Sequence, residues 1–357
     1  MPKESKQQIQ HPDFYHSVKL KSGFEYAYQE HKGDGTGTII ALPGLGVTSE
    51  SWEYQLEVFK KNYQRIILLD IPGSGKSDSY QQEISYQKLA DDLGEFLEKI
   101  SSSENFDLAG TSLGGAIATY FSHQQLPYRI DNLILINPAL TIEKTFDIQL
   151  RLALGKMSKF FQKFEDLALP QKLRQYIDPP LDQFFKYILA QRIFKKLFAS
   201  DEESAAKRDE FYDYFRDMIY SFSSSSYIHY GELIADHDLV AEFLADKKSR
   251  ENFGNNVGHV FLFCAADDRV ITRPAMQKSS SYLTQVSKES DIKFTELMVA
   301  GGHGAQVINS ENFNETWGNF VQTPNSQIKD NKSSTRPIKP IESHPCISTN
   351  ASKTLTT

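Results

Sequence analysis

Short apolar runs alternate with helix-like stretches along most of this 357-residue chain. Largely continuous apolar runs of this length are typical of strands buried on both faces of a parallel sheet. Between them, Tyr86–Ile100 and Leu113–Gln124 have the apolar spacing of helices. The alternation predicts βαβ units, and therefore an α/β fold with a mostly parallel central sheet. The predicted strands are Thr38–Leu42, Arg65–Leu69, Phe106–Ala109, Leu133–Ile136, Val260–Ala265 and Lys293–Val299.

An N-terminal hairpin precedes these units. Phe14–Leu20 and Phe24–Gln29 alternate apolar and polar residues on either side of Lys21-Ser22-Gly23, which predicts two antiparallel strands joined by a tight turn.

The alternation of strand-like runs and helical stretches stops between about Thr141 and Asn256, where helical stretches are interrupted by prolines and a serine run. This pattern predicts a helical cap inserted between two strands of the sheet. After Val321 the composition changes to Lys, Ser, Thr, Asn and Pro, which lacks the apolar content for a core and predicts disorder. We expect a polar extension at 1–13, a core at 14–140 and 257–322, a cap at 141–256 and a disordered tail at 323–357.

Composition narrows the class of protein. A hydrophobic content of 39% and a charged content of 24% fit a folded globular chain, and a net charge of -7 argues against nucleic-acid binding. No apolar run approaches the roughly 18 residues of a membrane helix, and the polar start has no secretion signal. Two cysteines, Cys264 and Cys346, cannot form a disulfide framework. We therefore expect a cytoplasmic protein.

The motif Gly110-Thr111-Ser112-Leu113-Gly114 matches G-x-S-x-G and stands between a predicted strand and a predicted helix. In that setting a sharp turn holds the serine in a strained conformation with its hydroxyl pointing outward from the turn. The small residues on either side let the strand and the helix approach closely. Ser112 is therefore the candidate nucleophile.

A serine nucleophile needs a base, and the base needs an orienting acid. His303, in Gly301-Gly302-His303-Gly304, follows the last predicted strand and is the candidate base. Two adjacent carboxylates, Asp267 and Asp268, follow the strand before it. We favour Asp268 as the acid, since it leads into the next helix near Pro274, and keep Asp267 as the alternative.

An acyl-transfer enzyme also needs backbone N–H donors where negative charge develops on oxygen. The segment Leu42-Pro43-Gly44-Leu45-Gly46 follows the strand at 38–42, and the amides of Leu45 and Leu113 are the candidate donors. Taken alone, this segment is equally compatible with an ordinary glycine turn that ends a strand.

Together these segments resemble the α/β-hydrolase superfamily from about Phe14 to Val321, apart from the variable cap. They follow the family's order and approximate spacing, although Pro43-Gly44 stands where many members have His-Gly. Ser112 also differs from the aspartate of the related epoxide hydrolases and haloalkane dehalogenases. The segments are Leu42-Pro43-Gly44 with Trp52, Asp70-Ile71-Pro72-Gly73-Ser74-Gly75-Lys76-Ser77, the Ser112 turn, Asn137-Pro138, and the Asp268 and His303 loops.

The resemblance implies a serine hydrolase that acts through an acyl-enzyme on Ser112 and needs no metal or other cofactor. The expected substrate is a small carboxylic ester, or a lipid-like one, with an apolar acyl or alcohol part. Amides, thioesters and carbon–carbon bonds beside a ketone remain alternatives, because a fold does not choose among them.

The predicted cap suggests where the apolar part of the substrate binds. Its stretches Gln149–Phe164 and Leu181–Phe198 mix apolar residues with lysines and arginines. This pattern fits helices that pack on the sheet, and it also fits peripheral contact with a membrane. Aromatic and histidine side chains later in the cap are candidates to line the substrate cavity, with ordinary packing as the alternative. They are Phe222, Tyr227, His229 and Tyr230.

Two other classes of protein compete with a hydrolase. Gly73-Ser74-Gly75-Lys76-Ser77 resembles the end of a phosphate-binding P-loop, but Asp70 stands where that motif needs glycine, and Pro72 removes a backbone donor. A hydrolase fold that serves only as a binding module is the second alternative. The presence of Ser112, Asp268 and His303 together argues against it.

Overall fold

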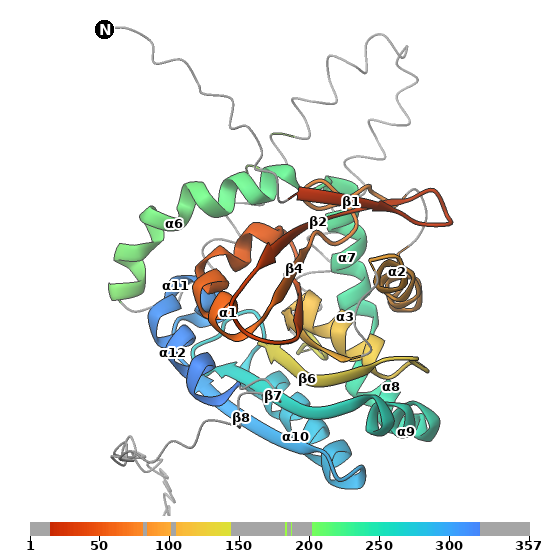
Figure 1. Ribbon diagram of the computed structural model, residues 1–357. Helices are drawn as coiled ribbons and strands as arrows, with labels where there is room; N and C mark the ends of the chain where they lie inside the picture. The colour runs from red at the N-terminus through yellow and green to blue at the C-terminus, as the bar shows by residue number, and fades with distance from the viewer. Residues whose placement is uncertain are drawn as a thin grey trace, which may run out of the picture.

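The structure is a computed structural model that describes residues 15–80, 84–100, 105–143 and 202–321, with the isolated residues Gln183 and Tyr187. Eight strands form one twisted sheet in the order β1-β2-β4-β3-β5-β6-β7-β8 (Figure 1). β1 and β2 form an antiparallel hairpin, and β2 also pairs antiparallel with β4. The pairs from β4 to β8 are all parallel. The strands are β1 Tyr15–Lys19, β2 Glu25–Lys32, β3 Thr38–Leu42, β4 Arg65–Leu69, β5 Asn105–Thr111, β6 Arg129–Ile136, β7 Val257–Ala265 and β8 Lys293–Val299.

The α/β class, the mostly parallel sheet and the N-terminal hairpin predicted from the sequence are confirmed. β3, β4 and β8 have the predicted bounds, whereas β5, β6 and β7 begin earlier, at Asn105, Arg129 and Val257, and β5 also ends later, at Thr111. A buried partner explains the extension of β6. Its Asn132 donates from the side-chain amide to the carboxylate of Asp107 in β5 at 2.9 Å, and that carboxylate also accepts from the hydroxyl of Tyr63 at 2.8 Å.

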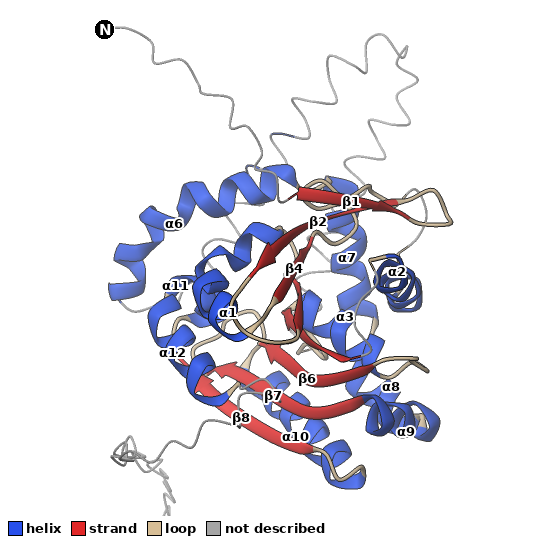
Figure 2. Ribbon diagram, viewed as in Figure 1, coloured by secondary structure: helices blue, strands red, loops and turns tan. Residues whose placement is uncertain are grey.

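Helices cover both faces of the sheet (Figure 2). On one face α2 (Tyr86–Lys99), α3 (Leu113–Ser122), α9 (Lys247–Asn256) and α10 (Arg273–Glu289) bury apolar side chains against the strands. On the other face lie η1 (Ser49–Gln55), α1 (Leu56–Asn62) and α12 (Ser310–Phe320). The apolar side chains form one cluster on each face of the sheet. Each fully buried large side chain contributes about 1.5–3 kcal/mol to stability, so these two clusters hold the helices on the sheet. The second cluster contains the fully buried Trp52, Phe59 and Trp317.

Local sequence explains where the helices begin. Ser85 caps α2, because its side chain accepts a hydrogen bond from the amide of Lys88, and the apolar residues of α2 then recur on one face. α10 begins at Arg273 and has Pro274 in its first turn, where a missing N–H costs nothing.

Among the described residues, three further helices precede α9 between β6 and β7: α6 (Glu202–Ser221), α7 (Ser224–Asp236) and α8 (Leu239–Ala245). Figure 1 shows α6 along the outside of the molecule. It packs through Phe211, Phe215 and Met218 on α11 (Ala305–Ile308), next to the loop of His303. Several predicted segments lie outside the described residues. They are the stretches 149–164 and 181–198, apart from Gln183 and Tyr187, the polar extension 1–13 and the tail 323–357.

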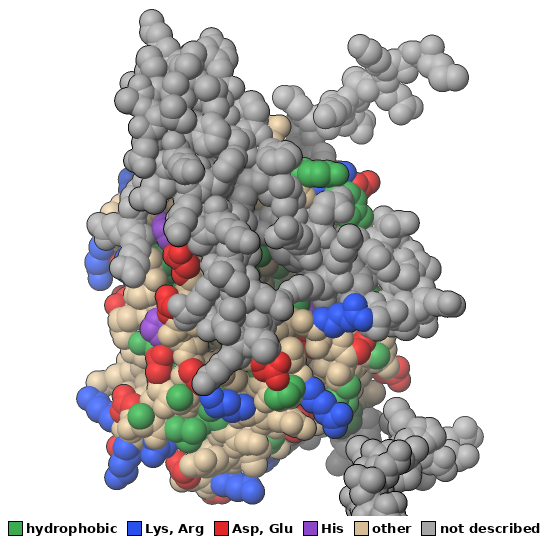
Figure 3. All heavy atoms as spheres, turned by 180° about the vertical axis from the view of Figure 1, so that it is seen from behind, with side chains coloured by type: hydrophobic (Ala, Val, Ile, Leu, Met, Phe, Trp, Pro, Cys, Tyr) green, Lys and Arg blue, Asp and Glu red, His purple; other side chains and the backbone are tan. Residues whose placement is uncertain are grey.

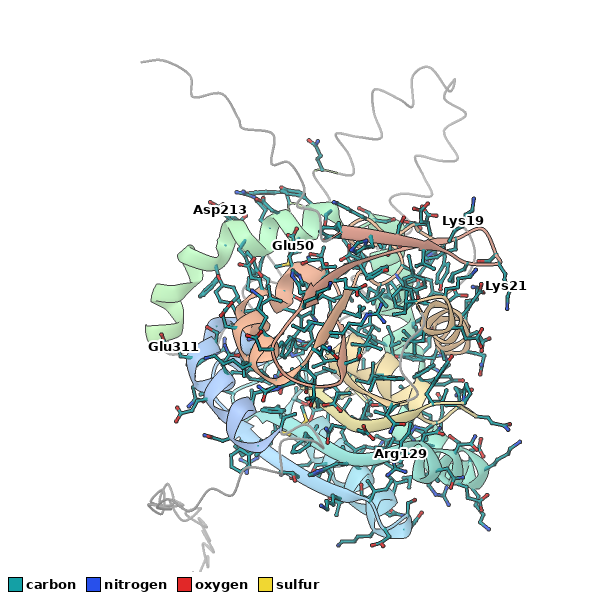
Figure 4. The ribbon with its side chains drawn as sticks, viewed as in Figure 1. Lys19, Lys21, Glu50, Arg129, Asp213 and Glu311 are labelled. Carbon is teal, nitrogen blue, oxygen red and sulfur yellow. The ribbon has the colours of Figure 1, made fainter. Side chains whose placement is uncertain are left out.

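The described surface carries charges of both signs, interspersed where they face the viewer in Figure 3. Figure 4 shows exposed charged side chains that project outward around the molecule, among them Lys19, Lys21, Arg129 and Glu311. Within the described ranges, no helix is both long enough and apolar enough to span a membrane.

Candidate active site

Ser112 stands at the sharp turn between β5 and α3. Its backbone has φ 51° and ψ -113°, an unfavourable conformation for a residue with a side chain. Neighbouring backbone stabilises it: the amide of Ser112 donates to the carbonyl of Ile136 at 2.9 Å, and its carbonyl accepts from Ala116 and Ala139. The residue is 7% exposed. The strained turn predicted from the motif is therefore present.

Three glycines make this turn sterically feasible. A Cβ on Gly110 would lie 2.4 Å from the carbonyl oxygen of Gly114, and one on Gly114 would lie 2.5 Å from those of Leu42 and Pro43. A Cβ on Gly115 would lie 2.8 Å from the Cβ of Pro138. β5, α3 and the loop after β3 approach so closely that only hydrogen fits at these positions.

Asp268 and His303 form a buried pair. Asp268 follows β7, His303 follows β8, and the Oδ2 of Asp268 lies 2.7 Å from the Nδ1 of His303. The other carboxylate oxygen accepts from the amides of Val270 at 2.7 Å and Ile271 at 2.9 Å. Both acid oxygens are thus held in place, and the Nε2 atom of the imidazole is left to face another group.

The neighbouring carboxylate has a different contact. Asp267 is exposed, and its Oδ1 accepts from the amide of Gly302 at 3.1 Å. In this structure the carboxylate that reaches the imidazole is that of Asp268, the favoured one of the two candidates. Asp267 instead binds the histidine loop one residue before His303, a contact that the sequence analysis did not predict.

The loop after β3 lies beside the nucleophile. A Cβ on Gly44 would lie 3.5 Å from the Cβ of Ser112 and 3.5 Å from the carbonyl oxygen of Thr111. Gly46 has φ +80°, which turns the chain back at the residue after Leu45. In the described part of the chain, the amides of Leu45 and Leu113 have no hydrogen-bond acceptor. The loop of Leu45 approaches Ser112 at Gly44, and Leu113 follows Ser112 in the chain, so both predicted donor residues belong to segments adjacent to Ser112.

Of the predicted cavity residues, Tyr227 lies nearest to this loop: a Cβ on Gly46 would be 3.2 Å from its Cε2 atom. Phe222 is buried and contacts the rings of Tyr227 and Tyr230 edge-on, with centroids 6.1 Å apart in each pair. Tyr230 is fully buried in the main core cluster, whereas His229 is half-buried. Tyr227 is thus the one of the four that the structure brings against the predicted donor loop.

The loop that resembles a P-loop encloses a carboxylate of the protein itself. Asp70 accepts from the amides of Ser49 at 2.8 Å and Lys76 at 3.0 Å. A Cβ on Gly75 would lie 2.1 Å from the Oδ2 of Asp70, so this oxygen fills the concave side of the turn. Burial raises the pKa of the Asp70 carboxyl, and the two amide donors lower it. The space that would cradle a phosphate in an NTPase is occupied by Asp70.

The described residues include no group of three or more His, Cys, Asp or Glu side chains placed to hold a metal ion. The serine, the histidine, the two aspartates and the amides of the loop after β3 lie at the carboxyl edge of the sheet, after β3, β5, β7 and β8. Such a set can transfer an acyl group through a serine ester.

Comparison with known proteins identifies the family. The model of the alpha/beta hydrolase fold matches residues 37–310, which is most of the chain. The protein therefore belongs to the α/β hydrolase fold family.

Two curated relatives illustrate how far the sequence similarity extends. The AB hydrolase superfamily protein YisY of Bacillus subtilis (strain 168) is 29% identical over 161 residues, which cover 43% of this chain and 60% of the relative. Epoxide hydrolase 4 of Mus musculus is 32% identical over 123 residues, which cover 34% of this chain and 33% of the relative. The matches span less than two thirds of these relatives' own lengths.

Solved structures share the fold over a longer span. A hydrolase from Pseudomonas aeruginosa PA01 superposes with a TM-score of 0.66 at 15% identity, covering 88% of this chain and 100% of that one. An esterase from Exiguobacterium antarcticum has a TM-score of 0.63 at 17% identity, covering 86% and 99%. At these identities the likeness shows the fold alone.

Proposed function

We propose that this protein is a serine hydrolase that cleaves a carboxylic ester through an acyl-enzyme on Ser112. The observation that carries the proposal is the position of three elements at one edge of the sheet. These are a serine with φ 51°, a histidine whose Nδ1 lies 2.7 Å from a buried carboxylate, and a glycine loop against the serine. This is the constellation that acyl transfer requires.

In the proposed mechanism, His303 takes the proton of the Ser112 hydroxyl as the oxygen attacks the substrate carbonyl. Asp268 holds the imidazole with its Nδ1 protonated and stabilises the imidazolium. The amides of Leu45 and Leu113 donate to the developing oxyanion. His303 then protonates the leaving alcohol, and an acyl-enzyme remains. Water, activated by His303, attacks that ester and releases the acid.

The proposed substrate has an apolar part beside the scissile bond. Among the described residues, the side chains against the donor loop are Tyr227 and Ile219, which lie 3.2 and 3.8 Å from the place where a Cβ on Gly46 would stand. An apolar acyl or alcohol group would remove apolar surface from water there. The proposed cap, residues 141–256, would provide this wall.

Names of related proteins support ester chemistry without defining the substrate. One curated relative, from Wigglesworthia glossinidia brevipalpis, is a pimeloyl-[acyl-carrier protein] methyl ester esterase that is 30% identical over 105 residues. Amide, thioester and carbon–carbon bond hydrolysis use the same groups and are the competing reactions on this site.

Hydrolysis of p-nitrophenyl esters from acetate to decanoate tests the proposal. We expect turnover by the 357-residue protein, with kcat/KM rising with the length of the acyl chain over the first few carbons. We expect Ser112→Ala to lower kcat by about 10³-fold or more. A folded wild-type protein without activity on any of these esters, but active on amides or thioesters, would correct the substrate class. An active Ser112→Ala variant would refute the mechanism.

A further inference from the structure

We propose that Asn137 is a positioning residue that holds the loops of His303 and Asp268 in register. The inference rests on the proposed function, because it assigns to Asn137 the support of that same site. Asn137 is the residue after β6, it is fully buried, and its φ is 42°. Asparagine is one of the few residues other than glycine that adopt this left-handed conformation at little cost.

Its side chain bonds to the ends of two other strands. The Oδ1 of Asn137 accepts from the amide of Ala265, the last residue of β7, at 2.8 Å. The Nδ2 of Asn137 donates to the carbonyls of Gly302 at 3.3 Å and His303 at 3.4 Å. One amide group thus connects the segment that carries the acid with the segment that carries the base.

These bonds are part of a closed ring of contacts that returns to Asn137. Ala265, bound by Asn137, accepts through its carbonyl from the amide of Asp268 at 3.2 Å. Asp268 contacts the imidazole of His303, and the carbonyl of His303 returns to Asn137. A shift of either loop would break a bond to Asn137, so the side chain fixes the separation between carboxylate and imidazole.

The main chain beside Asn137 supports the nucleophile as well. The amide of Ser112 donates to the carbonyl of Ile136, and the amide of Asn137 donates to the carbonyl of Phe263 at 3.0 Å. The end of β6 therefore contacts all three segments that carry the proposed catalytic groups. None of these bonds reaches substrate, which makes Asn137 a positioning residue.

Only a side-chain amide satisfies this site. It must accept from one amide and donate to two carbonyls within the same buried volume, and Asn offers one acceptor and two donors at the required length. Aspartate would keep the bond to Ala265 but would place a carboxylate against two carbonyl oxygens. Glycine would keep the backbone conformation and remove every side-chain bond.

The test compares two substitutions with a matched control. Asn137→Gly removes the side chain without backbone strain, and Asn137→Asp is nearly isosteric. Asn256→Ala is the control, since Asn256 is also buried and also donates to two backbone carbonyls, those of Ser122 and Gln124, in a different part of the fold. All are made in the full chain and assayed below their unfolding temperatures.

We expect Asn137→Gly and Asn137→Asp to lower kcat for a p-nitrophenyl ester by about 10- to 100-fold, since small misplacements of reacting groups have effects of this size. KM should stay within about threefold, and fluorophosphonate labelling of Ser112 should slow in parallel. For Asn137→Asp, the acid limb of the kcat/KM profile should move to higher pH, because a new carboxylate at the backbone of His303 favours the protonated form of its imidazole. Asn256→Ala should lower the unfolding temperature with kcat within about twofold.

Two results would overturn the inference. If either Asn137 variant is folded and keeps kcat within about twofold of the wild type, or if Asn256→Ala loses as much kcat, Asn137 has only a structural role. If Asn137→Gly does not fold, Asn137→Asp alone decides by the same criteria. Failure of the proposed function is distinct: the wild-type protein itself would not be labelled on Ser112, and the inference would fall with it.

Discussion

Asp268 and His303 are separated by 35 residues of sequence, yet the Oδ2 of one lies 2.7 Å from the Nδ1 of the other. β7 and β8 are parallel neighbours, so the loops that follow them leave the same edge of the sheet. Ser112 leaves that edge after β5, and Ile136, at the end of the intervening strand β6, binds its amide. The order of the strands thus explains how three residues far apart in the sequence come to lie at one edge of the sheet.

The two adjacent aspartates should differ sharply on substitution. Asp268→Asn should lower kcat by about 10³- to 10⁴-fold, because an amide no longer selects the productive tautomer of His303. Asp267→Asn, which retains an oxygen that can accept from Gly302, should lower kcat by no more than about threefold. Steady-state kinetics of both folded variants provides the comparison. A larger loss for Asp267→Asn would assign the acid to Asp267, and equal losses would contradict the assignment to Asp268 alone.

Substitution by alanine at two glycines in different surroundings should change the free energy of unfolding in opposite directions. Gly114→Ala would bring a Cβ to 2.5 Å from the carbonyl oxygens of Leu42 and Pro43, so we expect a loss of several kcal/mol in stability and at least about 10²-fold in kcat as the donor loop moves.

Gly94→Ala is the control for Gly114→Ala. In the middle of α2 the nearest atom to its Cβ, a ring carbon of Phe121, is at 3.8 Å. This variant should gain about 0.5–1 kcal/mol from helix propensity with unchanged kcat. Chemical denaturation and ester hydrolysis measure both variants. Normal kcat in Gly114→Ala would show that close contact with the donor loop is dispensable.

Nucleotides should not stabilise the protein, because Asp70 already occupies the loop at 73–77. A ligand present at 1,000 times its Kd adds about 4 kcal/mol to the free energy of unfolding, which a thermal melt detects easily. We expect no change in the unfolding temperature with millimolar ATP and Mg²⁺, and a large decrease for Gly75→Ala, whose Cβ would clash with Asp70. A rise of several degrees with ATP would revive the NTPase interpretation.

Stability should depend on pH through Asp107. Burial raises the pKa of this carboxyl to about 7, against the donors Asn132 and Tyr63, which lower it. The native state therefore binds more protons than the unfolded state between about pH 4 and pH 7, and stability falls as the pH rises through that window. Asp107→Asn removes this dependence, so its free energy of unfolding relative to wild type should rise by roughly 2 kcal/mol from pH 5 to pH 8.

The free energies of unfolding of wild type and Asp107→Asn must be compared at each pH, because the titration of other buried groups changes stability with pH in the opposite direction. Burial lowers the pKa of His123 to about 3, so its contribution to stability increases with pH between about 3 and 6.5. Urea denaturation of the wild type and Asp107→Asn at several pH values cancels that contribution. A difference between the two proteins that does not vary with pH would show that Asp107 titrates normally.

From the sequence alone we could predict those features of the fold and of the site that depend on the local pattern of residues. The alternation of apolar runs and helical stretches predicted the fold class, the strand–turn–helix setting of Ser112 predicted the turn, and the glycines around His303 marked its loop. Asp267 and Asp268 are adjacent, and only the pairing of β7 with β8 shows which carboxylate faces the imidazole. Contacts made across long stretches of chain had no local signal. Asn137, which bonds to residues 128 and 166 positions away, was visible only as part of a family motif.

The loop at 73–77 shows a second limit of local pattern. Its glycines and lysine match part of a phosphate-binding motif, and the mismatch at Asp70 weakened that reading without explaining the loop. The structure supplies the explanation, because the carboxylate of Asp70 lies where the loop's amides converge. A residue that departs from a motif can be the group that replaces the motif's ligand.

The central claim is that Ser112 is an activated nucleophile, and mapping of a fluorophosphonate adduct tests it most directly. We predict one adduct on the 357-residue protein, located on Ser112 by peptide mass spectrometry. It should be absent from Ser112→Ala and formed at least about 10²-fold more slowly by His303→Ala, because the serine is a poor nucleophile without its base. Folded wild-type protein that remains unlabelled, or an adduct on another residue that persists in Ser112→Ala, would contradict the account.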